Sequence, residues 1–236
     1  MNRKIISIIP ACLFVLCTNC CANNETRQET MNNAERTLPV TWSANDSIQY
    51  FDIDYDALLT GEANKYREVS HPTPNYDRNA VNEVKGVILH HTAEPTAEKS
   101  LDVLTNSPRN VGTHVVIDYD GTRYIMCAPE VVTYHAGPSI LNGRESCNKF
   151  TIGIEFQGNT VEAPLTEDQI LSAIEYLRPI IAKYHIPMKN IVTHEMVRKA
   201  YKAKYPKSKT YGKVDITQAE YKHFMAYFKK EVKAKK

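Results

Sequence analysis

The chain has 236 residues, of which 42% are hydrophobic and 24% are charged, and both values are ordinary for a globular protein. This length is enough for one domain of ordinary size together with additional segments. The formal net charge is only +2 at pH 7. Proteins that bind nucleic acid usually carry a strongly basic face or a known motif, so no nucleic-acid partner is expected.

The first 22 residues have the pattern of a secretory signal peptide. A basic start precedes a mostly apolar run over residues 5–17, which is too short to span a membrane. Cleavage after Ala22 fits this pattern, and so does a bacterial lipoprotein leader that is lipidated at Cys20 or Cys21. Both alternatives stay open. We therefore expect an exported protein of the periplasm or cell envelope that meets a membrane only through such a lipid.

Composition divides the rest of the chain into three parts. Residues 23–38 are polar and lack periodicity, which predicts a flexible tether. Residues 39–70 contain several large apolar side chains, so this extension is expected to pack on the main domain. Residues 71–236 form that domain. Its two cysteines, Cys127 and Cys147, could form a disulfide in an exported protein or remain thiols.

Hydrophobic periodicity and turn signals predict strands interleaved with helices in the main domain. Asp120-Gly121 predicts a β-hairpin. Capping boxes begin at Thr166 and Thr217, and Pro179 is expected to kink or shorten the first of these two helices. The pattern indicates an α/β fold with one mixed central sheet flanked by helices. The expected strands are 85–91, 113–118, 122–128, 150–157 and 190–193, and the expected helices are 97–105, 167–184, 195–203 and 218–232.

The strand expected over residues 85–91 ends in two histidines, His90 and His91. Because neighbouring strand residues point to opposite faces, these histidines are not expected to serve one site. A lone strand histidine is at least as often a core residue as a ligand. Here, however, His194 follows another short apolar run and Asp215 precedes a helix. Two histidines, a carboxylate and a separate glutamate are the residues of a catalytic zinc site.

The separate glutamate is Glu155, on the strand expected over residues 150–157. It shares one face of that strand with Thr151 and Gly153, and apolar residues occupy the other face. An acid on an otherwise apolar strand is costly to bury unless it has a partner or a task. Because the glycine leaves space on this face, we expect a ligand to lie beside Glu155.

Six segments of the chain together carry a family resemblance: 87–93, 112–122, 134–137, 148–155, 192–195 and 213–215. In this order they resemble the zinc-dependent N-acetylmuramoyl-L-alanine amidases. Their superfamily also contains phage lysozyme-type amidases and animal peptidoglycan recognition proteins. The resemblance extends over roughly residues 71–232 and implies a mixed sheet flanked by helices, in a single catalytic domain with zinc in a surface groove.

The resemblance also implies residue roles. By position, one zinc ion per chain would be bound by His90, His194 and Asp215. Glu155 would be the acid-base residue, and Lys213 would stabilise the oxyanion. These roles have alternatives in the sequence. Asp215 could be a plain turn or N-cap acid, and Lys213 could be one more solvated lysine of a late lysine cluster.

Three further residues are candidates for substrate binding. His135 could be an ordinary loop histidine instead, and Asn148 could be a plain turn residue. His114 could have only a structural role in lining the groove. Other members place a tyrosine directly before the histidine equivalent to His114, whereas this chain has Thr113, so Glu155 is expected to act alone in acid-base catalysis.

The family cleaves the amide that joins the lactyl group of N-acetylmuramic acid to the L-alanine of the peptide stem. The resemblance therefore predicts a monomeric cell-wall hydrolase acting on peptidoglycan or muropeptides, which agrees with export. The alternative function is a non-catalytic module of the same fold that only recognises peptidoglycan. A further alternative is a zinc peptidase that cuts within the stem. The chain does not contain HExxH, which is the commonest motif of such peptidases.

Overall fold

The computed structural model describes residues 47–59, 65–209 and 215–232, which all belong to one structural unit of the chain, Val40–Lys236. The expected leader over residues 1–22, the expected tether over 23–38 and Lys213 lie outside the described residues.

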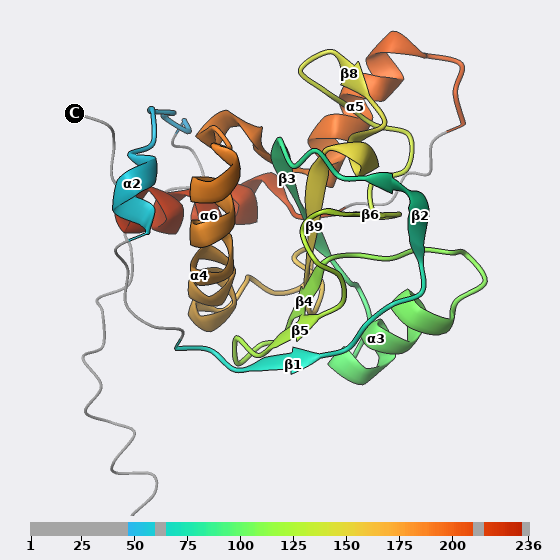
Figure 1. Ribbon diagram of the computed structural model, residues 1–236, viewed down its shortest axis with the longest axis horizontal. Helices are drawn as coiled ribbons and strands as arrows, with labels where there is room; N and C mark the ends of the chain where they lie inside the picture. Colours follow the sequence, from blue (N-terminus) through green and yellow to red (C-terminus); the bar gives the residue numbers. More distant parts are fainter. Residues whose placement is uncertain (1–46, 60–64, 210–214, 233–236) are drawn as a thin grey trace, which may run out of the picture. The chain divides into compact units, whose positions relative to one another are not determined.

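A mixed sheet of six strands forms the centre of this part (Figure 1). The strand order is β1-β5-β4-β9-β3-β10. Neighbouring strands of this sheet are parallel except β4 and β5, which form the hairpin predicted at Asp120-Gly121. The strands are β1 (Glu68–Ser70), β3 (Gly86–His91), β4 (Val115–Ile117), β5 (Arg123–Ile125), β9 (Thr151–Phe156) and β10 (Ile191–Thr193).

One face of the sheet is apolar and packs against two helices, α4 (Glu167–Tyr184) and α6 (Gln218–Glu231). In Figure 1 both helices lie on the same side of the central strands. Successive residues of a strand point to opposite faces, and Val87 and Leu89 of β3 face this core. The expected α/β fold with a mixed sheet and flanking helices is therefore confirmed.

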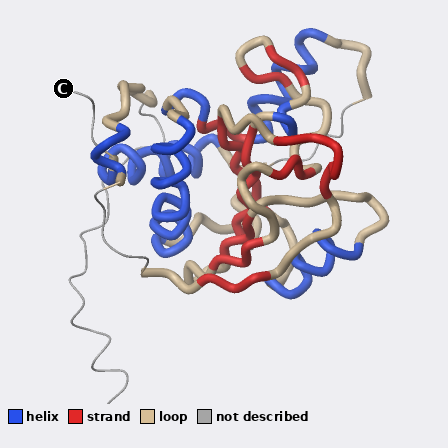
Figure 2. The backbone as a smooth tube through the Cα atoms, viewed as in Figure 1, coloured by secondary structure: helices blue, strands red, loops and turns tan. Residues whose placement is uncertain are grey.

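The opposite face carries shorter elements. Ile88 packs with Val192 and with Val197 of α5 (His194–Lys204), while Val116 packs against α3 (Ala97–Asn106). Loops make up much of this layer, as the tan segments in Figure 2 show. Alternate residues of a strand share a face, so the side chain of His90 lies on this face together with that of Ile88.

Several short elements were not predicted. They are only two to six residues long and lack a clear alternation of buried and exposed residues, so periodicity could not reveal them. Two of them form a ribbon beside the sheet, and two others form a small hairpin. The elements are β2 (Tyr76–Val81), β6 (Val131–Thr133), β7 (Ile140–Leu141), β8 (Arg144–Glu145), α2 (Tyr55–Leu58) and the 3₁₀ turns η1 (Cys147–Lys149) and η2 (Met188–Asn190).

Helix α4 begins at the predicted capping box. The Thr166 hydroxyl accepts a hydrogen bond from the Gln169 amide at 3.1 Å, and the Gln169 side chain accepts one from the Thr166 amide at 3.0 Å. Of the two effects expected of Pro179, a kink or a shorter helix, shortening is excluded, because α4 continues to its predicted end at Tyr184. Ile181 beyond the proline is fully buried in the core. This burial offsets the hydrogen bond that proline cannot donate.

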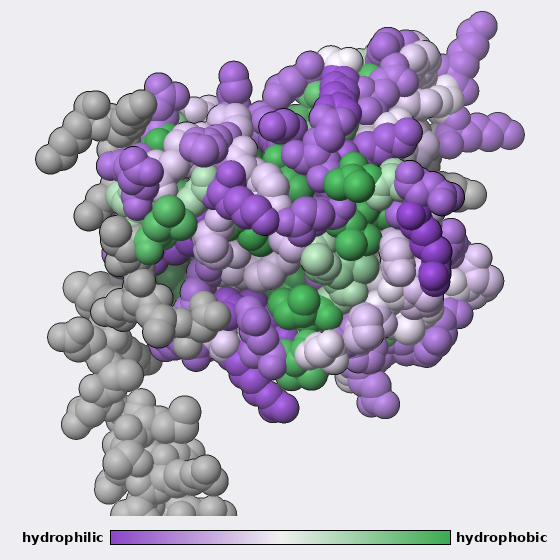
Figure 3. Space-filling view, viewed as in Figure 1, coloured by the Kyte–Doolittle hydropathy of each residue, from purple (hydrophilic) through white to green (hydrophobic). Residues whose placement is uncertain are grey.

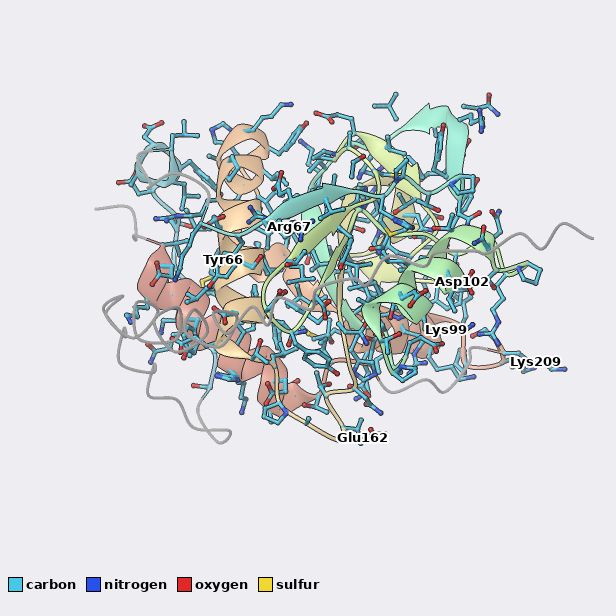
Figure 4. The ribbon with its side chains drawn as sticks, turned by 90° about the horizontal axis from the view of Figure 1, so that it is seen from below. Tyr66, Arg67, Lys99, Asp102, Glu162 and Lys209 are labelled. Atoms are coloured by element: carbon cyan, nitrogen blue, oxygen red, sulfur yellow. The ribbon has the colours of Figure 1, made fainter. Side chains whose placement is uncertain are left out.

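Edge strand β1 is fixed to the sheet by a buried arginine. Tyr66 and Arg67, labelled in Figure 4, lead into this strand. The Arg123 side chain has no exposed surface, and its guanidinium lies 3.1 Å from a carboxylate oxygen of Glu68 and 3.0 Å from one of Glu175. A buried charge of this kind is tolerated only when it is paired and hydrogen-bonded. In this way the chain before the main domain is joined to β5 and α4.

None of the described helices is both long enough and apolar enough to cross a bilayer. On the face seen in Figure 3, hydrophobic residues form small separate patches among polar ones.

Cys127 and Cys147 are both free thiols, so the disulfide alternative is not realised in this structure.

Candidate metal centre

Three separate elements bring the predicted ligands together. In the parallel pairing of β3 with β9, His90 lies directly opposite Glu155, so both side chains point to the same side of the sheet. His194 is the first residue of α5, which follows β10 without a loop. Asp215 is buried just before α6, although Lys209, the last described residue before it, lies at the periphery (Figure 4).

The potential ligand atoms of His90, His194 and Asp215 all lie within 4.8 Å of one another. Oδ2 of Asp215 is 3.3 Å from Nδ1 of His90 and 2.9 Å from Nδ1 of His194. The side chains of His90 and Asp215 are almost completely buried, whereas that of His194 is 20% exposed. The cluster is therefore enclosed on the sheet side and accessible beside His194.

The outer atoms of two of these residues are held by the backbone. Oδ1 of Asp215 accepts hydrogen bonds from the amides of His91 at 2.7 Å and Ile216 at 3.1 Å. Nε2 of His194 lies 3.1 Å from the carbonyl oxygen of Ala136. A carbonyl can only accept, so this nitrogen carries the proton and Nδ1 of a neutral His194 ring is an acceptor.

This arrangement fits a cation. Two imidazole nitrogens and one carboxylate oxygen lie within 4.8 Å of one another, and acceptors in such proximity require a proton or a metal between them. Burial opposes ionisation of Asp215, but His90 and His194 together hold the pKa of its carboxyl well below the usual range. A charged carboxylate with two imidazoles is a common donor set for zinc.

Glu155 stands beside this cluster without belonging to it. Its side chain is half-buried and lines the same cavity, which has a volume of about 230 Å³. The cavity continues from the cluster towards α3. Part of its wall was missed by sequence reasoning because these residues form no recognisable motif. This part consists of Glu94, Ser100, Val103, Leu104, Arg109 and Val111, whereas Thr92, Gly112 and Tyr134 belong to the recognised segments.

His135 occupies part of the strand face on which Glu155 lies. A Cβ atom added to Gly153 would lie 2.6 Å from Cγ of His135, so the ring of His135 occupies the space that the glycine opens. The room for a ligand beside Glu155 is therefore provided by the cavity and not by the space directly over Gly153. His135 does line the cavity, and its Nδ1 lies 3.1 Å from Nε2 of His90. Burial, followed by the proximity of His90, His114 and His194, holds the pKa of His135 well below its usual value.

His114 and Asn148, the other two candidates for substrate binding, contact the protein backbone in this structure. His114 has no exposed surface; its Nε2 donates to the carbonyl oxygen of Val131 at 2.9 Å and its Nδ1 accepts from the amide of Gly153 at 3.0 Å. Oδ1 of Asn148 accepts from the amide of Ala136 at 2.7 Å and so fixes the loop that holds His194. Both residues support the cavity from behind its wall.

The enclosure of His114 leads to a pH prediction. Burial lowers the pKa of this histidine to about 4, against about 6.5 in an unfolded chain. As the pH falls below 6.5, the unfolded chain takes up this proton first, so the contribution of the neutral ring to stability is lost between about pH 6.5 and pH 4. The shift is equivalent to about 3 kcal/mol.

We therefore expect the free energy of unfolding of the wild type to fall more steeply between pH 7 and pH 4.5 than that of His114→Gln. Urea unfolding of both proteins across this range measures the difference. Equal pH slopes would contradict a depressed pKa at His114, whatever the stability of the variant at pH 7.

Comparison with known proteins identifies the family of the chain and agrees with the fold. The family model described as N-acetylmuramoyl-L-alanine amidase matches residues 80–210, which is more than half of the chain. The chain belongs to this family. The match ends before Asp215, so the place of this residue in the cluster rests on the structure.

Two curated relatives are similar in sequence. N-acetylmuramoyl-L-alanine amidase AmiD of Escherichia coli K12 is 32% identical over 126 residues, which are 47% of this chain and 45% of AmiD. The 1,6-anhydro-N-acetylmuramyl-L-alanine amidase AmpD of Haemophilus influenzae is 38% identical over 87 residues, covering 36% of this chain and 46% of AmpD. The chain thus matches about half the length of these relatives.

A solved structure supports the fold alone. The crystal structure of a selenomethionine derivative of AmpD superposes with a TM-score of 0.51 at 22% identity, and the alignment covers 69% of this chain and 96% of that one.

Proposed function

We propose that this protein is a zinc hydrolase that cleaves the amide between N-acetylmuramic acid and L-alanine in peptidoglycan or muropeptides. The observation that carries the proposal is the convergence of His90, His194 and Asp215 beside Glu155, in a chain of the amidase family. The names of the relatives AmiD and AmpD describe the same kind of bond.

His90, His194 and Asp215 would hold the zinc ion. When bound, the ion would lower the pKa of its water towards ~7 and would polarise the scissile carbonyl. Their arrangement leaves the side of His194 open to the cavity, where a substrate can approach. A catalytic site needs such an open position, whereas a structural zinc site is closed by four protein ligands.

Glu155 would carry the proton transfers. Its position opposite His90 on the next strand places its carboxylate at the cavity wall and outside the ligand cluster. It can accept a proton from the attacking water and return it to the nitrogen that leaves with L-alanine. Lys213, outside the described residues, would stabilise the oxyanion, a role typically worth about 3 kcal/mol.

Several accompanying proposals concern the whole chain. The leader over residues 1–22 would direct export, and Cys20 or Cys21 would carry the lipid if the leader is of the lipoprotein type. Export would place the enzyme on the same side of the cytoplasmic membrane as intact peptidoglycan. The enzyme would act as a monomer.

The test is digestion of purified peptidoglycan and of 1,6-anhydromuropeptides, followed by mass spectrometry of the products. We expect free stem peptides that begin with L-alanine, together with glycans that retain the lactyl group. His90→Ala should give neither product because zinc is lost. Binding of muropeptides without any cleavage by the zinc-loaded wild type would support the recognition module, and products cut within the stem would support a peptidase.

A further inference from the structure

A line of hydrogen bonds runs from the backbone of η1 to the outer nitrogen of His90. The Thr151 hydroxyl lies 2.7 Å from the carbonyl oxygen of Cys147 and 3.3 Å from Nε2 of His135. On the other side of that ring, Nδ1 of His135 lies 3.1 Å from Nε2 of His90. These contacts connect β9, the loop after β6 and the end of β3.

The chemistry of the groups fixes the direction of each bond. The carbonyl of Cys147 can only accept, so the single hydroxyl proton of Thr151 is donated there. Thr151 then accepts from Nε2–H of His135, which leaves Nδ1 of the neutral His135 ring as an acceptor. Nε2 of His90 must donate to it. As a result, Nδ1 of His90 faces Asp215 as a metal-binding nitrogen.

The ring of His135 is held in this orientation by its surroundings. Gly153 provides the space, since an added Cβ would lie only 2.6 Å from Cγ and 2.7 Å from Nδ1 of this ring. The ring of His114 packs against it edge-on, with centroids 5.8 Å apart and an interplanar angle of 77°. His114 is itself fixed by its bonds to the backbone.

Ala136, the next residue after His135, contacts His194, the second histidine of the cluster. The carbonyl of Ala136 accepts the proton of Nε2 of His194, and the amide of Ala136 is anchored by Asn148. Residues 135 and 136 therefore meet the outer nitrogens of both histidines of the cluster, one through a side chain and the other through a carbonyl.

We infer that His135 is a positioning residue for the metal centre, which holds His90 in the tautomer and orientation that metal binding requires. The inference rests on the proposed function, because it assumes that His90 is a ligand. Hydrogen-bond partners of ligand histidines raise the donor strength of the ring and commonly affect metal affinity about 10- to 100-fold. A neutral imidazole adds no negative charge, so Asp215 remains the only carboxylate of the ligand cluster.

The test measures zinc affinity of the purified protein by competition with a chromophoric chelator. His135→Leu removes the acceptor, and we expect zinc to bind about 10- to 100-fold more weakly. His135→Asn places an amide oxygen where Nδ1 was, so its affinity should stay much closer to that of the wild type. His223→Leu is the control, because His223 pairs with Glu220 on α6 and lies outside the cluster.

A second variant tests this line of hydrogen bonds without changing a histidine. Thr151→Val keeps the shape of the side chain but removes the hydroxyl that selects the His135 tautomer, so weaker zinc binding is expected here also. Thermal unfolding with excess chelator shows whether each variant folds without metal. If His135→Leu does not fold, the comparison of Thr151→Val with the wild type decides.

The outcomes separate this inference from the proposed function. A wild type that binds no zinc would overturn both. A wild type that binds zinc, with His135→Leu and Thr151→Val variants of unchanged affinity, would overturn the positioning role while the proposed function stands. Equal losses in His135→Asn and His135→Leu would also overturn it, because the acceptor at the Nδ1 position would then make no difference.

Discussion

Replacement of Glu155 by glutamine is expected to abolish most amide cleavage while zinc binding and folding persist. Glutamine has the shape of glutamate but cannot accept a proton at neutral pH. General acid-base groups typically contribute ~100- to 10,000-fold to the rate, so a loss of that size in kcat is expected. The zinc content should not change, because Glu155 lies beside the ligand cluster and outside it.

Zinc content, muropeptide binding and amide cleavage are measured on one preparation of Glu155→Gln. His90→Ala is the contrasting variant, since it should lose zinc and cleavage together. Normal cleavage by Glu155→Gln would exclude the glutamate as the acid-base residue. Loss of zinc from this variant would instead move Glu155 into the ligand set.

The parts of the fold that sequence reasoning predicted are those with a local cause. The run before His90 is long and apolar, and the Asp120-Gly121 turn has its own backbone preference, so β3 and the β4–β5 hairpin were predictable. The capping box at Thr166 is likewise a local signal. The different faces of His90 and His91 followed from strand geometry: the side chain of His91 bonds Thr160, away from the cluster.

The parts that could not be predicted depend on contacts between distant segments. Gly153 indicates an open space on β9, but the sequence does not say that His135, from the loop after β6, fills it. The burial of His114 has the same cause, because a ribbon that lacks a clear pattern covers it. One residue of these contacts was visible in the sequence: strand alternation places Thr151 on the same face as Glu155.

Asp215→Ala is expected to lose zinc. Asp215 supplies the negative charge of the cluster and lies within hydrogen-bonding distance of Nδ1 of His194. Its removal also leaves the buried amides of His91 and Ile216 without their acceptor, and each such group costs about 1–3 kcal/mol of stability. Asp215→Asn keeps an oxygen for these amides, so it separates the loss of a ligand charge from the loss of support for the backbone. Elemental analysis and urea unfolding of both variants measure the two effects.

Glu195 provides the matched control, because it is the carboxylate nearest to His194 in the sequence. Its side chain is 30% exposed and lies 3.0 Å from Lys199 on the next turn of α5, away from the cluster. An exposed pair of this kind contributes little to stability, so Glu195→Ala should retain zinc, fold and activity. A metal-bound structure with Glu195 coordinated and Asp215 remote would overturn the assignment. Zinc retained by Asp215→Ala would do the same, since two histidines alone are a poor site for this ion.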